Sequence, residues 1–260
     1  MTWPMLEQIL GHLAAIPLFE LLLIGSVALF ASVVGGVTGY GTGALMPLVL
    51  VPLVGAESVV PILAISALFN NTWRAMVFRS LIDWRRALIV AACAVPTCIV
   101  TAYGYTLLTG RGAAIVIGGM LMLMVPLRYW FKRMEFRLND SSLAACSVGY
   151  GAAVGGTVGA GVILLSLLMA AGLQGAAVIA TDAAISIVVT AVRMAVFGFA
   201  GVIDAKVIAF ALLIGVVAFP GAFLARALVG KMSLAFHTAI LDAVVLIGGA
   251  TMVIGALIRP

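Results

Sequence analysis

Five glycines within nine residues interrupt an apolar run that is too long for one membrane crossing. The run extends from Leu18 to Val54 and contains one charged residue, Glu20, near its start. As a continuous helix it would be about 55 Å long, whereas the hydrocarbon core of a bilayer is about 30 Å thick. The run must therefore break, and the segment 35–43 is where it can. Irregular backbone at membrane depth is tolerated only where protein or a water-filled cavity satisfies its polar groups, so this segment is the first candidate for a transport site.

The composition places the whole chain in the membrane. Hydrophobic residues make up 65% of the sequence and charged residues 9%, too few charges for the water-facing surface of a soluble domain. We therefore expect an all-α polytopic membrane protein, and its 260 residues hold about eight to ten segments of membrane-spanning length. The net charge of +5 comes mostly from arginines in short loops, so it carries topology information and predicts no nucleic-acid partner.

The second half of the chain repeats the plan of the first. The apolar run 142–171 is again too long for one crossing and again carries glycines, clustered at 155–161. We expect a first transmembrane repeat at 1–131, a basic cytoplasmic linker at 132–141 and a second repeat at 142–260. Each repeat opens with a glycine-broken helix pair. Internal repeats of this kind are typical of secondary transporters.

Further apolar segments follow each broken run. In the first half we expect segments at 59–78, 87–108 (bent or restarted near Pro96) and 113–127. In the second half we expect segments at 176–199, 205–229 and 234–257.

The basic loops set the expected orientation. The loops at 79–86 and 128–137 are two crossings apart, so both can be cytoplasmic under the positive-inside rule. Counting Lys and Arg does not decide between parallel and inverted repeats, because Lys206 and Arg259 fit the first arrangement, and Arg226 and Lys231 fit the second. The length of the glycine-broken runs favours doubling back and hence inverted repeats of five segments each.

These features together resemble a known family. The element Gly39-x-Gly41-x-Gly43-x-x-x-Pro47, its reduced copy in the second half, the basic loop with Asp83-Trp84-Arg85 and the basic divide are similar to those of the sulfite exporter TauE/SafE family. The resemblance covers nearly the whole chain. It implies a multi-pass permease of the bacterial inner membrane that moves sulfite, sulfoacetate or other small sulfur-containing or organic anions.

The sequence departs from the family pattern in two places. The second glycine copy has Leu165 or Ser166 where Pro47 stands in the first, so the two halves of the site need not be strictly symmetric. In addition, Asp182 stands where the family more often has a small hydroxyl residue. A fully charged anion is compatible with this site only if Asp182 is protonated or paired.

The candidate substrate-binding residues lie at the glycine breaks and in the segments that follow them. Successive glycine N–H groups and the N-termini of half-helices attract anions. Hydroxyl, amide and guanidinium groups nearby add donors, with Thr38 as a further hydroxyl. The predicted set is Gly39, Gly41, Thr42, Gly43, Asn70, Asn71, Arg74, Thr157, Gly159, Gly161 and Arg193. The structural alternatives are close helix packing for the glycines, interhelical hydrogen bonds for the asparagines and snorkelling for Arg74.

Asp182 is the candidate proton-coupling residue. It lies about two turns into an otherwise apolar helix, where burial disfavours a charged carboxylate. Arg193 lies on the same helix face but is about 16 Å away along the axis, too far for direct pairing. A carboxylate in a wet vestibule is the alternative interpretation.

We therefore predict a secondary transporter for small anions, with the lipid bilayer as its environment and homodimer formation left open. The rival hypotheses are a passive anion channel, a thiosulfate-type carrier that uses Cys93, Cys98 and Cys146, and a membrane enzyme. The sequence predicts no cofactor, metal site or catalytic set, because the cysteines have no metal-ligand spacing and His12 and His237 lie in no motif.

Overall fold

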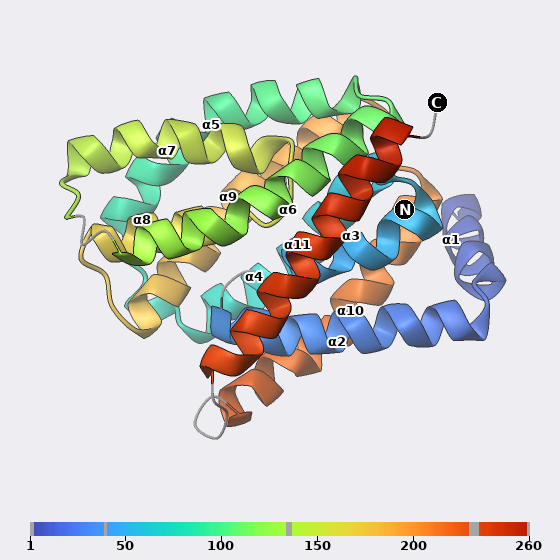
Figure 1. Ribbon diagram of the computed structural model, residues 1–260, viewed down its shortest axis with the longest axis horizontal. Helices are drawn as coiled ribbons and strands as arrows, with labels where there is room; N and C mark the ends of the chain where they lie inside the picture. The colour runs from blue at the N-terminus through green and yellow to red at the C-terminus, as the bar shows by residue number, and fades with distance from the viewer. Residues whose placement is uncertain (1–2, 39–40, 134–136, 229–233, 259–260) are drawn as a thin grey trace.

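The computed structural model describes residues 3–38, 41–133, 137–228 and 234–258, and every regular element within these ranges is helical (Figure 1). A short 3-10 turn lies at Arg79–Leu81. The α-helices are α1 (Trp3–Ala15), α2 (Leu18–Thr38), α3 (Gly41–Val54), α4 (Ala56–Val77), α5 (Trp84–Thr106), α6 (Gly110–Arg133), α7 (Asp140–Gly155), α8 (Gly161–Ala170), α9 (Ala176–Phe199), α10 (Ala205–Leu228) and α11 (Leu234–Ile258).

Both predicted helix breaks are confirmed. Helix α2 ends at Thr38 and α3 begins at Gly41, while α7 ends at Gly155 and α8 begins at Gly161. Each broken run then folds back, because α3 packs against α2 and α8 packs against α7. The two glycine clusters thus end one helix and start another that returns along it.

The structure refines two details of the segment prediction. Helix α5 is continuous through Pro96, so of the two predicted alternatives, bent or restarted, the restart does not occur. A proline removes one N–H donor, which a membrane helix tolerates where neighbouring helices support it, and α5 packs against α7 and α9. Helix α6 continues to Arg133, and α7 starts at Asp140, so both ends of the predicted linker 132–141 are helical. Residues 134–136 of that linker lie outside the described residues.

Three of the described helices are long and apolar enough to cross a membrane. They are Trp84–Thr106, Gly110–Phe131 and Ala176–Phe199. A fourth crossing results if the pair Met5–Ala15 and Leu18–Val34, bent by 98°, counts as one span. The eight to ten predicted segments also count shorter apolar helices, and within the described residues the broken runs contribute Thr42–Val54 and Gly161–Ala170 of this kind.

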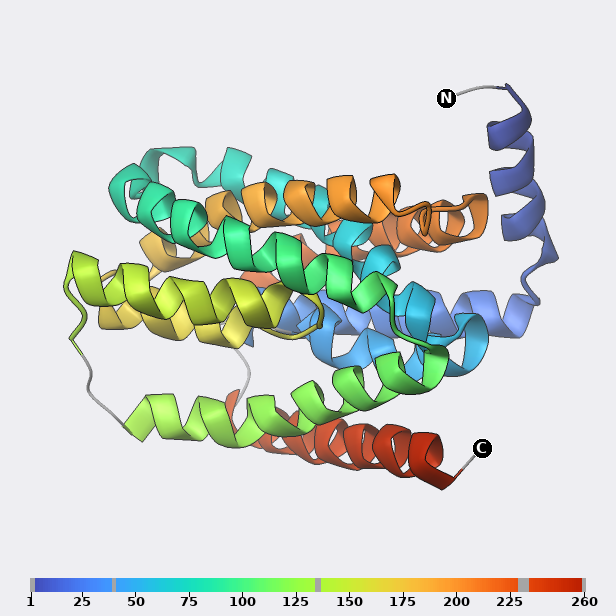
Figure 2. The ribbon, with the colours of Figure 1, turned by 90° about the horizontal axis from the view of Figure 1, so that it is seen from above.

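The helices pair across the two halves of the chain. Helix α4 packs against α9 at the centre, α5 packs against α7 and α9, and α10 packs against α2 and α4. Helices α6 and α11 form a further layer and run in opposite directions, as Figures 1 and 2 show. Helix α1 packs against α10. The central pair α4 and α9 is therefore covered by helices from both halves.

Close packing of α5 against α7 depends on glycine. A Cβ atom at Gly151 would collide with the carbonyl oxygen of Ala94, whereas a Cβ at Gly149 on the same helix would meet nothing within 4 Å. We predict that Gly151→Ala lowers the free energy of unfolding by about 1–3 kcal/mol, because the two backbones must separate. Gly149→Ala is the matched control. Thermal unfolding in detergent measures both, and equal midpoints for the two variants would contradict this packing.

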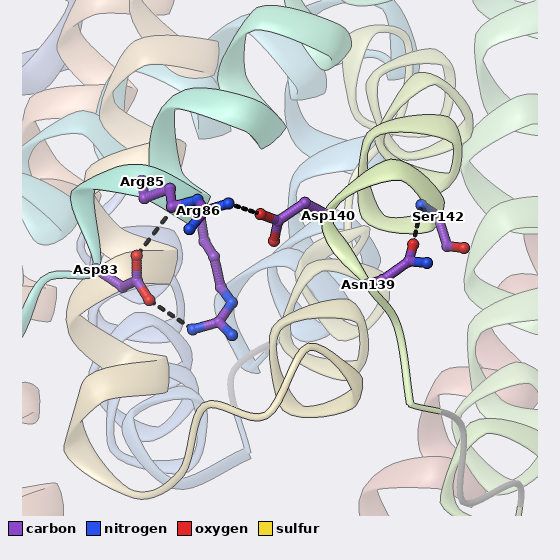
Figure 3. Close-up of polar contacts among 6 residues, drawn as sticks. All are labelled: Asp83, Arg85, Arg86, Asn139, Asp140 and Ser142. Carbon is purple, nitrogen blue, oxygen red and sulfur yellow. Dashed lines mark hydrogen bonds and ion pairs between the residues drawn. The ribbon is translucent and has the colours of Figure 1, made fainter.

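The two basic loop regions lie at one end of the helix bundle, where an ion pair connects them. The guanidinium of Arg85 lies 2.5 Å from the carboxylate of Asp140, as Figure 3 shows. Arg85 follows the α4–α5 connection and Asp140 begins α7, so the loops after α4 and α6 lie at the same end, as predicted. Each helix there also has a side-chain N-cap, because Asp83 accepts from the N–H of Arg86 and Asn139 accepts from the N–H of Ser142.

Asp83 gives this end of the molecule a pH-dependent stability. Partial burial raises the pKa of Asp83, but the backbone N–H and guanidinium of Arg86 together lower it further, so the pKa lies below its usual range. The carboxylate therefore stabilises the fold above the ordinary carboxyl pKa of about 4, and this contribution is lost as pH falls through the lowered value.

Two substitutions of Asp83 separate the cap from the charge. Asp83→Ala removes both and is expected to cost about 1 kcal/mol at pH 7. Asp83→Asn keeps a capping oxygen, so its smaller cost is expected to shrink as pH falls below 4. Unfolding midpoints at pH 7 and at about pH 3 test this. A cost for Asp83→Asn that grows on acidification would contradict the assignment.

Candidate functional site

The two glycine breaks and the central helices α4 and α9 enclose a cavity of about 140 Å³. This volume is small beside the clefts of about 300–1,000 Å³ that hold drug-sized ligands, so it suits a molecule of few non-hydrogen atoms. The lining comes from both halves of the chain and combines polar and apolar surface in about equal parts. Its members are Ser32, Thr42, Gly43, Leu63, Ser66, Ala67, Asn70, Asn71, Arg74, Tyr150, Val154, Thr157, Val158, Gly159, Ala160, Gly161, Asp182, Ser186, Val189, Thr190 and Arg193.

The structure brings most of the predicted site residues to this one cavity. Nine residues of the predicted substrate-binding set belong to its lining. Of the other two, Gly39 lies outside the described residues, and Gly41 begins α3 but its surroundings are not described. Thr38 is the last residue of α2 and its side chain is not described. The structure therefore gathers predicted residues that are up to 151 positions apart, from Thr42 to Arg193, around one cavity.

The two breaks touch each other at the cavity. A Cβ atom added to Gly43 would lie 2.8 Å from the backbone nitrogen of Gly159. Gly159 has a φ of +84°, a conformation that glycine adopts without strain. Only a pair without side chains lets the start of α3 and the turn before α8 approach this closely.

Widening this contact is expected to impair the site. We predict that Gly43→Ala reduces transport at least about tenfold, because a shift of one break by a fraction of an ångström misplaces the donors around the cavity. Gly119→Ala on α6 is the control, since a Cβ there meets nothing within 4 Å. Flux into proteoliposomes, normalised to folded protein, provides the measurement. Equal flux for the two variants would show that the contact between the breaks has no role in transport.

Arg74 and Asp182 form an ion pair between α4 and α9. The guanidinium lies 3.0 Å from the Asp182 carboxylate and also donates to the side-chain oxygen of Asn71 at 3.1 Å. The Arg74 side chain is 15% exposed and that of Asp182 5% exposed, so the pair lies inside the protein. Asp182 is thus paired, and pairing is one of the two conditions under which the site is compatible with a fully charged anion. Arg74 points into the protein and does not snorkel.

Arg193 is a second buried cation that lines the cavity. Its guanidinium donates to the carbonyl oxygen of Thr157 at 3.2 Å and lies over the ring of Phe197, and its Nε has no hydrogen-bond partner. No described carboxylate lies within ion-pair distance of it. Thr157 therefore orients Arg193 through its main chain, while its hydroxyl donates to the carbonyl of Ala153 at 2.5 Å.

The sequence analysis missed several polar residues of the lining. Ser186 and Thr190 lie between the predicted residues Asp182 and Arg193 at spacings of three or four, so the four form one stripe along α9 that a helical count would have found. Ser66 precedes Asn70 by four residues and belongs to the same face of α4. Tyr150 of α7 had no such signal, because it is a single polar side chain among small residues.

A second buried ion pair lies outside the cavity. Arg128 of α6 pairs with Asp242 of α11, and the hydroxyl of Tyr129 donates to the same carboxylate at 2.9 Å. Arg128 had been assigned to the basic loop, yet it connects two helices. This ion pair connects α6 and α11, the two helices of the outer layer.

Two larger hollows lie away from the cavity charges. One of about 520 Å³ lies between α4 and α10 and is lined by apolar side chains such as Phe69, Trp73 and Phe219. The other, of about 680 Å³, lies among α3, α6 and α11. Within the described residues, no group of three potential metal ligands gathers in any of these places.

Comparison with known proteins provides one match. The sequence model of the family described as "Sulfite exporter TauE/SafE" matches residues 24–252 of the chain. Neither the curated proteins nor the solved structures compared with the chain include a match.

Proposed function

Because this chain belongs to the sulfite exporter TauE/SafE family, we propose that it is a secondary transporter that carries a small anion through the cavity between its glycine breaks. Membership of the family implies a multi-pass membrane protein that exports sulfite or related sulfur compounds. The finer proposal is that sulfite, sulfoacetate or another small organosulfonate or organic anion binds in the cavity of this chain. The proposed location is the bacterial inner membrane, with the two basic loops on the cytoplasmic side.

The observation that carries this proposal is the state of Arg193. A cation inside a membrane protein costs free energy unless an anion or strong acceptors surround it. Arg193 is 7% exposed, lines the cavity and lacks a described carboxylate partner, while its Nε has no acceptor. A bound anion would complete its coordination. The N-terminus of α8 has no side-chain cap, and Ala160 and Gly161 line the cavity, so its backbone N–H groups can add donors to the same anion.

The helix pairings support a duplicated, inverted architecture. If α2–α6 correspond to α7–α11, the contact of α5 with α7 becomes that of α10 with α2, and the contact of α5 with α9 becomes that of α10 with α4. Under the same correspondence the contacts α4–α9 and α6–α11 each map onto themselves. Helices α6 and α11 run in opposite directions. An odd number of segments per half would produce this inversion, and the cavity would then lie at the interface of the two repeats.

Flux measurements test the proposed function. Purified protein in liposomes is expected to accelerate uptake of labelled sulfite or sulfoacetate in a saturable manner, with counter-transport when unlabelled anion is loaded inside. The absence of any flux of an organosulfur anion above empty liposomes, with folded protein, would contradict the substrate class. Unitary currents without counter-transport would instead identify a passive anion channel.

The cysteine-based alternative has a separate test. None of Cys93, Cys98 and Cys146 belongs to the described lining of the cavity. We therefore expect the triple alanine variant to retain flux. Loss of flux in a folded triple variant would favour a thiosulfate-type carrier that uses thiol chemistry.

A further inference from the structure

The charged groups of the cavity are not equivalent. Among the described residues that line it, three carry a formal charge, namely Arg74, Asp182 and Arg193. Arg74 is neutralised by Asp182 at 3.0 Å, whereas Arg193 has only neutral acceptors. The site therefore offers one cation at all times and a second cation only when Asp182 loses its negative charge.

The surroundings of Asp182 leave Arg74 as its main electrostatic partner. Tyr150 of α7 interacts with Asp182, and Cys98 of α5 lies near Tyr150 and Arg193; both groups are neutral in their protonated forms. The backbone N–H of Asp83 bonds the hydroxyl of the adjacent Thr181, and the Asp83 carboxylate itself is paired with Arg86. Helix α8 contributes no charged side chain.

Protonation of Asp182 would release Arg74 without leaving it isolated. The guanidinium already donates to Asn71, so its position does not depend on the carboxylate alone. A proton on one Asp182 oxygen cancels the attraction, and the freed donors of Arg74 then face the cavity. Because uncompensated charge is costly at membrane depth, the free Arg74 and a second negative charge on the substrate stabilise each other.

We propose that Asp182 is a proton-binding group that sets the number of protons carried according to the charge of the substrate. This inference rests on the proposed anion transport. A monoanion is neutralised by Arg193 and is carried without a proton. A dianion needs Arg74 as well, so it enters together with one proton, which binds to the Asp182 carboxylate and leaves with the anion. The net charge of the loaded site is zero in both cases.

Two sulfonates of different charge test the proposal. Methanesulfonate is a monoanion and sulfoacetate a dianion at neutral pH. Binding to the purified protein is measured by isothermal titration calorimetry in two buffers of different ionisation enthalpy, which reports protons taken up per anion. Uptake into liposomes containing a pH-sensitive dye reports protons carried. We expect about one proton per sulfoacetate and about none per methanesulfonate, since only the dianion requires the second cation.

The variant Asp182→Asn supplies the decisive comparison. An amide cannot take up the proton, and it leaves Arg74 permanently free, so sulfoacetate is expected to bind and move without proton uptake. Asp182→Glu restores a carboxylate and is expected to restore the proton. Equal proton numbers for the two anions, or proton uptake with sulfoacetate in folded Asp182→Asn, would overturn the proposal. Absence of binding and flux of both anions in the wild-type protein would instead overturn the proposed function and this inference with it.

Discussion

Replacing Arg193 by Met is expected to abolish anion binding and flux while leaving the fold as stable as before or more stable. The guanidinium is buried, has an Nε without an acceptor and has no described carboxylate partner. Hydrogen bonds from a charged donor are worth about 1.5–3 kcal/mol each, so losing two of them lowers affinity by at least about 100-fold. A Met side chain fills similar space without the desolvation cost of a cation.

A ligand-binding arginine and a structural one differ in what their replacement does. Replacing the first lowers anion binding but does not lower stability, whereas replacing the second lowers stability. Flux and calorimetry measure anion binding and transport, and thermal unfolding in detergent measures stability. Arg111→Met is the control, because Arg111 is exposed at the start of α6 and bonds the carbonyl of Leu257. Retained binding in Arg193→Met, or a fall in its unfolding midpoint larger than that of the control, would assign Arg193 a structural role.

Removing Arg74 from the Arg74–Asp182 pair is expected to destabilise the protein strongly. Arg74→Met leaves the Asp182 carboxylate buried without its cation, which costs about 3–5 kcal/mol in known buried pairs. The double variant Arg74→Met/Asp182→Leu removes both charges and is expected to recover most of that loss. Unfolding free energies of the single and double variants, taken as a cycle, give the coupling between the two residues.

An exposed pair of similar geometry provides the control for this cycle. Arg85 and Asp140 are 2.5 Å apart, but their side chains are 80% and 39% exposed. Arg85→Ala is therefore expected to cost about 0–1 kcal/mol. If Arg74→Met were no more costly than Arg85→Ala, the Arg74–Asp182 pair would be solvated and could not hold a charge in place for the transport cycle.

The candidate site was largely predictable because its elements depend on local rules. An apolar run of 37 residues must break, and glycine marks where, so the positions of Gly43 and Gly159 follow from length and residue type. Polar residues inside apolar helices are costly, so Asn71, Asp182 and Arg193 were singled out without knowledge of the fold.

Pairing between distant residues was not predictable in the same way. Asp182 was compared with Arg193 on its own helix, whereas its partner is Arg74, 108 positions earlier. Asp242 gave no signal that it would pair with Arg128 across α6 and α11. The continuity of α5 through Pro96 likewise depends on its neighbours α7 and α9, which a single-segment argument does not contain.

By itself, the sequence determined that this protein is helical, membrane-embedded and broken twice at glycine, because hydrophobicity, length and backbone sterics act within each segment. Only the tertiary structure decided which charges meet. It brought the two breaks into contact, paired the charge of Arg74 with that of Asp182 and left Arg193 lining the cavity. These outcomes depend on the tertiary structure because Coulomb interactions depend on distance in space and on burial.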